Sequence, residues 1–168
     1  ARYRICKKCN DMEFRPTIAE ISLKNLVHNY KLICNTLPKN TFICPMIKAN
    51  AYGHGDKEVA KALTKAGAKR FGVCLIEEAV KLRQANIKAE ILTFDIFDKH
   101  GAQAVADFQL TPALSSWDQL QALEKVKVKK TLKVHLKFNT GMNRLGFDLS
   151  DAKKLSGHFY KHKKLKLE

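Results

Sequence analysis

The sequence predicts an α/β fold in which strand and helix alternate around a parallel sheet. The main observation is a repeated pattern, in which a short apolar, β-favouring run is followed by a loop and a segment of helical periodicity. The apolar runs cover residues 41–47, 71–75, 90–94, 110–114 and 132–138, and a further run begins at Leu165. The helical segments begin near Asp56, Ile76, Asp98, Ser115 and Leu149. Parallel strands need crossover helices, and the sequence provides one after each run.

The second observation is the absence of a glycine-rich G-x-G-x-x-G motif after the first run of the repeat. A dinucleotide-binding sheet is therefore disfavoured, which leaves a (β/α)8 barrel or a flavodoxin-like sheet. Ahead of the repeat, residues 17–21 read as a short strand that leads into an amphipathic helix. Ser22 is a plausible N-cap of this helix, and Pro38 closes it. Its apolar residues at helical spacing are Leu23, Leu26, Val27, Tyr30, Ile33, Cys34 and Leu37.

Composition narrows the class of protein. A chain of 168 residues with 45% hydrophobic residues suits one domain with a real core and argues against disorder. No apolar run approaches the roughly 20 residues that a membrane-spanning helix needs. Residues 1–14 lack the apolar stretch of a secretory signal. Five scattered cysteines fit reduced thiols in a cytoplasm better than a disulfide framework.

The net charge of +15 raises the hypothesis of a nucleic-acid-binding protein. The basic excess lies in residues 2–8, 125–133 and 153–166. Aromatic residues do not interleave with these runs as a single-strand stacking platform needs. Solvated, lysine-rich faces are the preferred interpretation, with no specific nucleic acid as a partner.

The first loop with chemical potential reads KANAYGHG, from Lys48 to Gly55. Lys48 stands where a strand passes into its loop, and Gly53 and Gly55 permit a tight backbone close to a ligand. The helix expected from Asp56 would present its N-terminus to an anion such as a phosphate. Desolvation in a barrel mouth would favour the neutral amine that Schiff-base chemistry requires. A surface lysine is the alternative interpretation.

The second loop, residues 139–146, follows a strand with a mostly polar face. Alternation places Val134, Leu136 and Phe138 on one face, and the other face carries Lys133, His135, Lys137 and Asn139. A polar face that points into a barrel indicates function, whereas the same face on an edge strand would meet water. Arg144 could bind a carboxylate or a phenolate through two parallel hydrogen bonds.

Two other features carry weaker signals. Cys6 and Cys9 have zinc-knuckle spacing, but no second pair of ligands follows at a suitable distance, so no metal site is expected. Glu77 and Glu78 open a helix, where acidic side chains complement the helix dipole, and this structural role accounts for them.

Taken together, three segments resemble alanine racemase: the motif KANAYGHG, the segment HLKFNTGMNRLG from His135 to Gly146, and RPTIAEISLKNLVHNY from Arg15 to Tyr30. The resemblance covers residues 12–168 and implies a TIM-type (β/α)8 barrel that binds pyridoxal 5'-phosphate (PLP). Five to six of the eight barrel strands are expected here, so residues 12–168 would be the N-terminal portion of a truncated barrel that lacks the C-terminal β domain. Residues 1–11 are expected to be an unstructured extension.

The resemblance also implies roles for single residues. Lys48 would carry PLP as a Schiff base and act as the base on the D-amino-acid face. Tyr52 would hold the cofactor phosphate, and Arg144 would contact the phenolic oxygen of PLP and the substrate carboxylate. Lys137 matches a lysine that is carbamylated in some members, and Phe94 would line the pocket. Asn139 departs from the family, because an aspartate is usual there.

The implied function is an isomerase that interconverts L- and D-alanine for peptidoglycan synthesis, as a cytoplasmic homodimer with no membrane association. Racemisation needs a second acid/base group opposite Lys48, which in the family is a tyrosine of the partner subunit. The isolated 168-residue chain is therefore expected to be inactive. A serine or broad-specificity racemase, and a non-catalytic PLP-binding or interaction module, are the alternatives.

Overall fold

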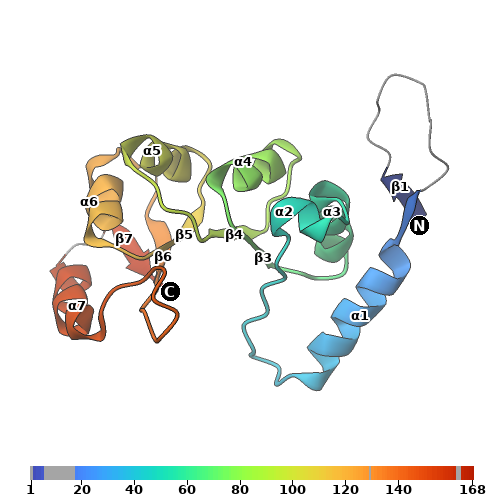
Figure 1. Cartoon of the computed structure of the whole chain (residues 1–168), viewed down its shortest axis with the longest axis horizontal. Coiled ribbons are helices and arrows are strands. Elements are labelled where there is room, and N and C mark those ends of the chain that lie inside the picture. Colours follow the sequence, from blue (N-terminus) through green and yellow to red (C-terminus); the bar gives the residue numbers. More distant parts are fainter. Residues whose placement is uncertain (1, 6–17, 129, 162–163) are drawn as a thin grey trace.

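The computed structural model describes residues 2–5, 18–128, 130–161 and 164–168. Its centre is a five-stranded parallel sheet in the order β3-β4-β5-β6-β7 (Figure 1). The strands are β3 (Arg70–Val73), β4 (Glu90–Thr93), β5 (Thr111–Leu114), β6 (Leu132–Leu136) and β7 (Leu165–Leu167). The helices that join them are α4 (Ile76–Gln84), α5 (Lys99–Asp107), α6 (Trp117–Lys125) and α7 (Ala152–Lys161), the last preceded by the short η1 (Leu149–Asp151).

This strand order decides between the two folds that the sequence leaves open. Each strand pairs with its neighbours in the sequence, which is the order of a (β/α)8 barrel, whereas a flavodoxin-like sheet has the order 2-1-3-4-5. The sheet does not close on itself within the described residues. It is therefore part of a barrel, in agreement with the expectation of five to six of eight strands.

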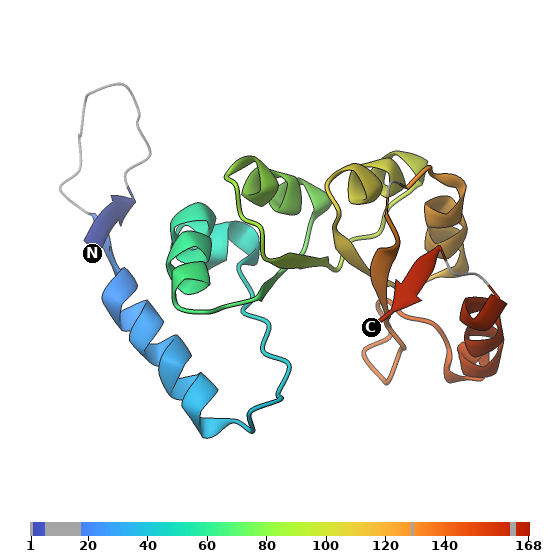
Figure 2. The ribbon, with the colours of Figure 1, turned by 180° about the vertical axis from the view of Figure 1, so that it is seen from behind.

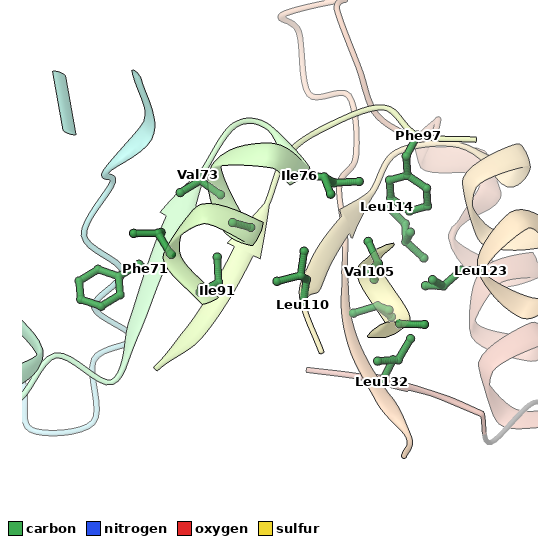
Figure 3. Close-up of a cluster of buried hydrophobic side chains, with 14 of the residues drawn as sticks. Phe71, Val73, Ile76, Ile91, Phe97, Val105, Leu110, Leu114, Leu123 and Leu132 are labelled. Carbon is green, nitrogen blue, oxygen red and sulfur yellow. The ribbon is translucent and has the colours of Figure 1, made fainter. Parts of the chain in front are cut away.

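One face of the sheet packs against a row of helices, and this layer holds the core (Figure 2). The row comprises α3 (Asp56–Lys65), α4, α5 and α6. Phe71, Val73 and Ile91 are completely buried, and Figure 3 shows them with Leu114 and Leu132 between the strands and the helices. Burying each such side chain contributes about 1.5–3 kcal/mol relative to exposure. Because side chains alternate along a strand, Arg70 and Gly72 face the opposite, inner side of the sheet.

The first predicted strand, residues 41–47, is much shorter in the structure. Only Met46 forms a bridge, in parallel with Gly72 of β3, and two hydrogen bonds flank it. Gly72 donates its N–H to the Pro45 carbonyl (2.9 Å), and Ile47 donates to the Gly72 carbonyl (2.8 Å). Pro45 has no N–H, which limits how far the pairing extends toward the N-terminus. The segment is nevertheless the edge of the sheet from which the Lys48 loop departs.

The N-terminal residues correct a second expectation. The sequence predicts no structure for residues 1–11, whereas Arg2–Ile5 form β1, antiparallel to β2 (Ala19–Ser22). The strand expected at residues 17–21 exists as β2, which begins at Ala19 rather than Thr17 and ends at Ser22; Ile18 is not part of it, and Thr17 lies outside the described residues. The unpaired N–H and C=O groups along a strand edge can pair with another extended segment, and here β1 pairs with the edge of β2. The remaining residues of the extension, including Cys6 and Cys9, also lie outside the described residues.

The helix after β2 is α1 (Leu23–Thr36), and Ser22 caps it as predicted, since its hydroxyl accepts a hydrogen bond from Asn25 N. Figure 1 shows α1 beside α3, at the end of the molecule away from α7. Only part of its apolar stripe is covered: Ile33 and Leu37 are 53% and 37% exposed. Periodicity predicts which residues share a face, but not whether another element covers that face. No helix among the described residues is long and apolar enough to span a membrane.

Candidate functional site

Lys48 lies where the edge of the sheet passes into a loop. Ile47, immediately before it, is 2% exposed and is fixed to β3 by its hydrogen bond to Gly72. Lys48 itself is half-buried. The predicted position of Lys48 at the carboxyl end of the sheet is therefore confirmed. The alternative, an exposed surface lysine, does not match its half-buried side chain.

The residues after Lys48 form a left-handed turn, labelled α2 (Lys48–Tyr52) in Figure 1. The φ angles of Ala49, Asn50, Ala51 and Tyr52 are 50°, 56°, 52° and 53°. Left-handed helical backbone costs L-amino acids about 1–2 kcal/mol per residue, so these four residues cost about 4–8 kcal/mol. Strain of this kind persists only where surrounding contacts hold it, and it clusters at binding and catalytic sites. The sequence indicates a tight turn at its glycines but not this path.

Backbone hydrogen bonds close the turn onto α3. The Asn50 carbonyl accepts N–H bonds from Gly53 (3.1 Å) and Gly55 (2.9 Å). The Asn50 side-chain oxygen accepts a further bond from Asp56 N (3.0 Å), and the Asp56 carboxylate accepts one from Lys57 N (2.7 Å). These two N–H groups at the start of α3 are thus occupied by protein oxygens. The expectation that they bind a phosphate is not supported.

Glu78 ties the Lys48 turn to the loop after β3. Its Oε1 accepts a hydrogen bond from Ala49 N (2.5 Å), 29 residues earlier in the chain. Its Oε2 accepts bonds from Cys74 N (2.9 Å) and Leu75 N (3.0 Å), at the start of its own helix. The sequence interpretation of Glu78 as a complement to the helix dipole is therefore incomplete. A glutamate at the third helical position is the sequence signal for the cap, but nothing local indicates the bond to Ala49.

The next loops are joined in the same way. The Asp95 carboxylate accepts a hydrogen bond from Ile76 N (3.1 Å), which links the loop after β4 to α4. Gln119, only 1% exposed, donates to the Asp95 carbonyl (2.8 Å). Its Oε1 accepts bonds from the N–H (3.0 Å) and hydroxyl (2.8 Å) of Ser115, after β5. Sequence reasoning misses Asp95 and Gln119, because these contacts depend on which strands become neighbours.

Lys137, which is half-buried, follows β6 and precedes the second predicted loop, residues 139–146. Lys137 donates its N–H to the Leu114 carbonyl of β5 (2.8 Å), and its carbonyl accepts a bond from Phe147 N (2.8 Å). Asn139 N in turn donates to the Phe147 carbonyl (2.9 Å). These bonds join the two ends of the loop, and Arg144 lies on the part of the loop between them.

Asn139 organises that loop. Its side-chain oxygen accepts bonds from Gly141 N (3.2 Å) and Asn143 N (3.0 Å), and its side-chain N–H donates to the Asn143 oxygen (2.7 Å). An aspartate, which is usual at this position in the family, could accept the same backbone bonds but could not donate to Asn143. The departure therefore keeps the turn and adds one hydrogen bond. Arg144 is exposed on this loop.

The inner face of the sheet carries a charged network at the amino ends of the strands. Glu90 accepts a bond from Arg70 Nε (3.2 Å) and one from the Thr111 hydroxyl (3.3 Å), and it lies 3.7 Å from Lys133 Nζ. Lys133 also pairs with Glu168 (3.2 Å). Hydrogen bonds from Lys166 and Lys133 hold the pKa of Glu168 below its usual range. The sequence predicts that the polar face of the strand at residues 132–138 points inward, and this is confirmed for Lys133 of β6.

His135 lies further along the same inner face. Its ring meets Phe42 edge-on, with the centroids 5.8 Å apart, and the Arg70 guanidinium lies 4.0 Å from the Phe42 centroid. His135 Nε2 is buried and has no hydrogen-bond partner among the described residues. A buried ring nitrogen without a partner is uncommon, and it marks a place for a polar ligand atom or a water molecule.

The four predicted ligand-binding side chains, Lys48, Tyr52, Lys137 and Arg144, all lie at the carboxyl side of the sheet. They do not form one contact cluster, because β3, β4 and β5 separate the Lys48 edge from β6. Tyr52 is 61% exposed and borders a cleft of about 470 Å³ between α1 and residues 43–47. Within the described ranges, no ion pair or side-chain hydrogen bond engages any of the four.

Phe94 lies on the inner face, near the start of the Lys48 loop. A Cβ added at Gly72 would come within 3.3 Å of Phe94 Cε2 and within 2.3 Å of Met46 Sδ. Phe94, Gly72 and Met46 therefore pack together two residues before Lys48. This place is compatible with the predicted role of Phe94 in lining a pocket.

The available groups fit PLP. A half-buried primary amine, a phenol and a guanidinium are the groups that would hold an aldehyde, a phosphate and an anionic oxygen. The unpartnered His135 nitrogen on the inner face is consistent with a polar ligand there. By contrast, no three His, Cys, Asp or Glu side chains in the described part of the chain gather as a metal site requires.

The lysine-rich runs are not simply solvated faces. Lys164 Nζ donates to the Glu124 and Val126 carbonyls, which joins β7 to the end of α6. Lys133, from another run, bridges Glu90 and Glu168 on the inner face. The interpretation of these runs as solvated is therefore wrong for the half-buried Lys164, whereas Lys133 is 45% exposed while it bridges the two carboxylates.

Known proteins match the chain in sequence and in structure. The family model for the N-terminal domain of alanine racemase matches residues 21–168. The alanine racemase of Carboxydothermus hydrogenoformans is 41% identical over 143 residues, which is 84% of this chain and 39% of that protein. The alanine racemase of Geobacter sulfurreducens is 35% identical over 159 residues, which is 94% of this chain and 42% of that protein. The crystal structure of alanine racemase from E. faecalis superimposes with a TM-score of 0.80 at 34% identity, covering 88% of this chain and 41% of that one.

The chain thus spans about two fifths of the length of these relatives. The family model covers the parallel sheet, the Lys48 turn and the loop of residues 139–146. This chain belongs to the alanine racemase family, and its parallel sheet is part of the N-terminal barrel domain of that family.

Proposed function

We propose that this chain provides the cofactor-binding lysine of a PLP-dependent alanine racemase, an isomerase that interconverts L- and D-alanine. The observation that carries the proposal is Lys48, half-buried on a strained turn at the carboxyl end of a parallel barrel sheet. Barrel enzymes place their chemistry at this end of the strands. The substrate is inferred from the names of the relatives.

The side chains would divide the work as follows. Lys48 would hold the cofactor covalently and would move the α-proton on one face of the substrate. Tyr52 would donate to the cofactor phosphate, and Arg144 would bind a carboxylate through two N–H groups. Lys137, if carbamylated, would become an anion that pairs with Arg144. PLP, when bound, acidifies the α-proton by delocalising negative charge into its ring.

Racemisation needs an acid/base group on each face of the substrate. Lys48 accounts for one face, and we infer that a tyrosine of a partner subunit serves the other in the intact, dimeric enzyme. The purified 168-residue chain should therefore interconvert D- and L-alanine little or not at all. Measurable racemisation by this chain alone would contradict that inference. A cytoplasmic location and a role in supplying D-alanine for peptidoglycan belong to the same proposal.

Covalent trapping tests the cofactor assignment. The chain is incubated with PLP at or below its own concentration, reduced with borohydride and digested, and each modified lysine is mapped by mass spectrometry. We expect the label on Lys48 to exceed that on any other lysine. Low PLP matters because the chain has 31 lysine and arginine residues in all, and excess PLP would label exposed lysines unselectively.

Two variants make the result specific. Lys48→Ala should remove the dominant label, whereas Lys57→Ala, at an exposed lysine of α3 nine residues away, should leave it unchanged. A label spread evenly over the lysines of the wild-type chain would overturn the PLP proposal. Labelling of Lys48 together with failure to support racemisation in a complete, dimeric enzyme would instead favour a non-catalytic PLP-binding module.

A further inference from the structure

Glu78 makes a contact that its role as a helix cap does not require. Two of its three hydrogen bonds, from Cys74 N and Leu75 N to Oε2, serve the start of α4. The third, from Ala49 N to Oε1, crosses to a different strand–helix unit and is the shortest of the three at 2.5 Å. One carboxylate therefore connects the residue after Lys48 to the end of β3.

The Lys48 turn has few other ties to the rest of the barrel. The backbone bonds of Gly53 and Gly55 to the Asn50 carbonyl are internal to the loop, and the Asn50 side chain bonds to Asp56 of the same unit. Among the described residues, the Glu78 contact is the only hydrogen bond from residues 48–55 to another strand–helix unit. This hydrogen bond therefore holds Ala49, the first of the four left-handed residues.

We propose that Glu78 is a positioning residue for Lys48, which holds the left-handed turn against the end of β3 and so fixes the direction in which the Lys48 side chain leaves the backbone. The proposal rests on the proposed function only for what Lys48 does with its amine. Without the Ala49 bond, the turn would stay attached to β3 only through Ile47, and the four left-handed residues would be free to relax toward ordinary backbone angles.

The chemistry of the contact explains why a carboxylate is needed. Three N–H donors converge on Glu78, and an ionised carboxylate offers two acceptor oxygens with four lone pairs. A glutamine has one acceptor oxygen, and its amide nitrogen can only donate. In Glu78→Gln the oxygen can keep the bonds to Cys74 N and Leu75 N, while the NH2 group would face the N–H of Ala49. This variant separates the link to the Lys48 turn from the helix cap.

Two matched variants serve as controls. Glu77→Gln removes the same charge from the neighbouring, exposed residue of the same helix. Asp95→Ala removes a different hydrogen-bond acceptor, that of Ile76 N, from the same helix terminus without touching the turn. The first control accounts for charge and helix dipole, and the second accounts for weakening of the α4 terminus.

The first measurement is amide hydrogen exchange of the cofactor-free chain, followed by mass spectrometry. In Glu78→Gln we expect exchange in peptides from residues 48–55 to rise at least about ten-fold, the loss expected for a hydrogen bond to a charged acceptor. Peptides from β5 and α6 should exchange as in the wild type, which a global loss of stability would not allow. Wild-type exchange in residues 48–55 of Glu78→Gln, or an equal rise in Asp95→Ala, would overturn the proposal.

The second measurement is the rate of borohydride-trapped PLP attachment at Lys48, with the exposed Lys57 as the internal standard. We expect Glu78→Gln to lower the ratio of Lys48 to Lys57 labelling by about ten-fold, with Glu77→Gln unchanged. An unchanged ratio would refute the positioning role. If the wild-type chain shows no preference for Lys48, the proposed function fails instead, and hydrogen exchange alone then decides whether Glu78 holds the turn.

Discussion

Two glycines, Gly141 and Gly146, test how closely the backbone of residues 138–147 packs. Gly146 and Gly141 have nearly the same φ, +133° and +134°, a region that is strained for any other residue. A Cβ on Gly146 would lie 2.5 Å from Asn139 N and 2.6 Å from the Phe138 carbonyl carbon, whereas a Cβ on Gly141 would meet nothing within 4 Å. Alanine at the two positions therefore introduces the same conformational strain, but only Gly146→Ala forces backbone atoms apart.

The expected magnitudes follow from this difference. The strained φ alone costs about 1–3 kcal/mol, which is the whole effect expected for Gly141→Ala. Gly146→Ala adds about 1–3 kcal/mol of overpacking, because the clash is with backbone rather than with the end of a flexible side chain. The clash falls on the Phe138–Phe147 bridge and its hydrogen bond from Asn139 N to the Phe147 carbonyl. We expect Gly146→Ala to be less stable than Gly141→Ala by about 2 kcal/mol.

Urea denaturation provides the assay. Far-UV circular dichroism reports the whole chain, and Trp117, the only tryptophan, reports locally because its ring centroid lies 5.7 Å from that of Phe147. Gly157→Ala, in α7 with open space around it, is the positive control and should stabilise the chain by about 0.5–1 kcal/mol. Equal free energies of unfolding for Gly146→Ala and Gly141→Ala, within about 0.5 kcal/mol, would refute the close backbone packing.

Two further predictions concern the outer layer. The Arg83 guanidinium donates hydrogen bonds to the carbonyls of Ile87, Ala89, Phe108 and Gln109. Because lysine has one compact ammonium group, Arg83→Lys should lower the free energy of unfolding, measured in urea, by about 2–4 kcal/mol. A loss under about 0.5 kcal/mol would contradict this. Hydrogen bonds from Gly101 N and His100 N hold the pKa of Asp98 below its usual range. Its stabilising effect is therefore complete above about pH 4 and is lost as the pH falls through the lower folded-state pKa. The advantage of the wild type over Asp98→Asn in urea midpoint should shrink across that range, and a constant difference would exclude the linkage.

Much of the fold could be read from the sequence. Alternating apolar runs and helical segments predict the strands from β3 to β7 within two or three residues at each end, because burial on one face leaves a periodic record in the chain. The N-caps Ser22 and Asp98 mark helix starts for the same local reason. The prediction of a strand over residues 41–47 was too long, because Pro45 cannot donate to the ladder and only a single bridge forms.

The sequence by itself determined that Lys48 stands at the end of a sheet strand and that the inner face of β6 is polar, since both follow from the order of residues along one element. Only the tertiary structure decided that Ala49, Asn50, Ala51 and Tyr52 adopt left-handed backbone and that Glu78 holds them. The physical reason is distance along the chain: the carboxylate and the N–H that it accepts from are 29 residues apart. They meet only because the Lys48 edge and β3 become neighbours, and no local periodicity records that pairing.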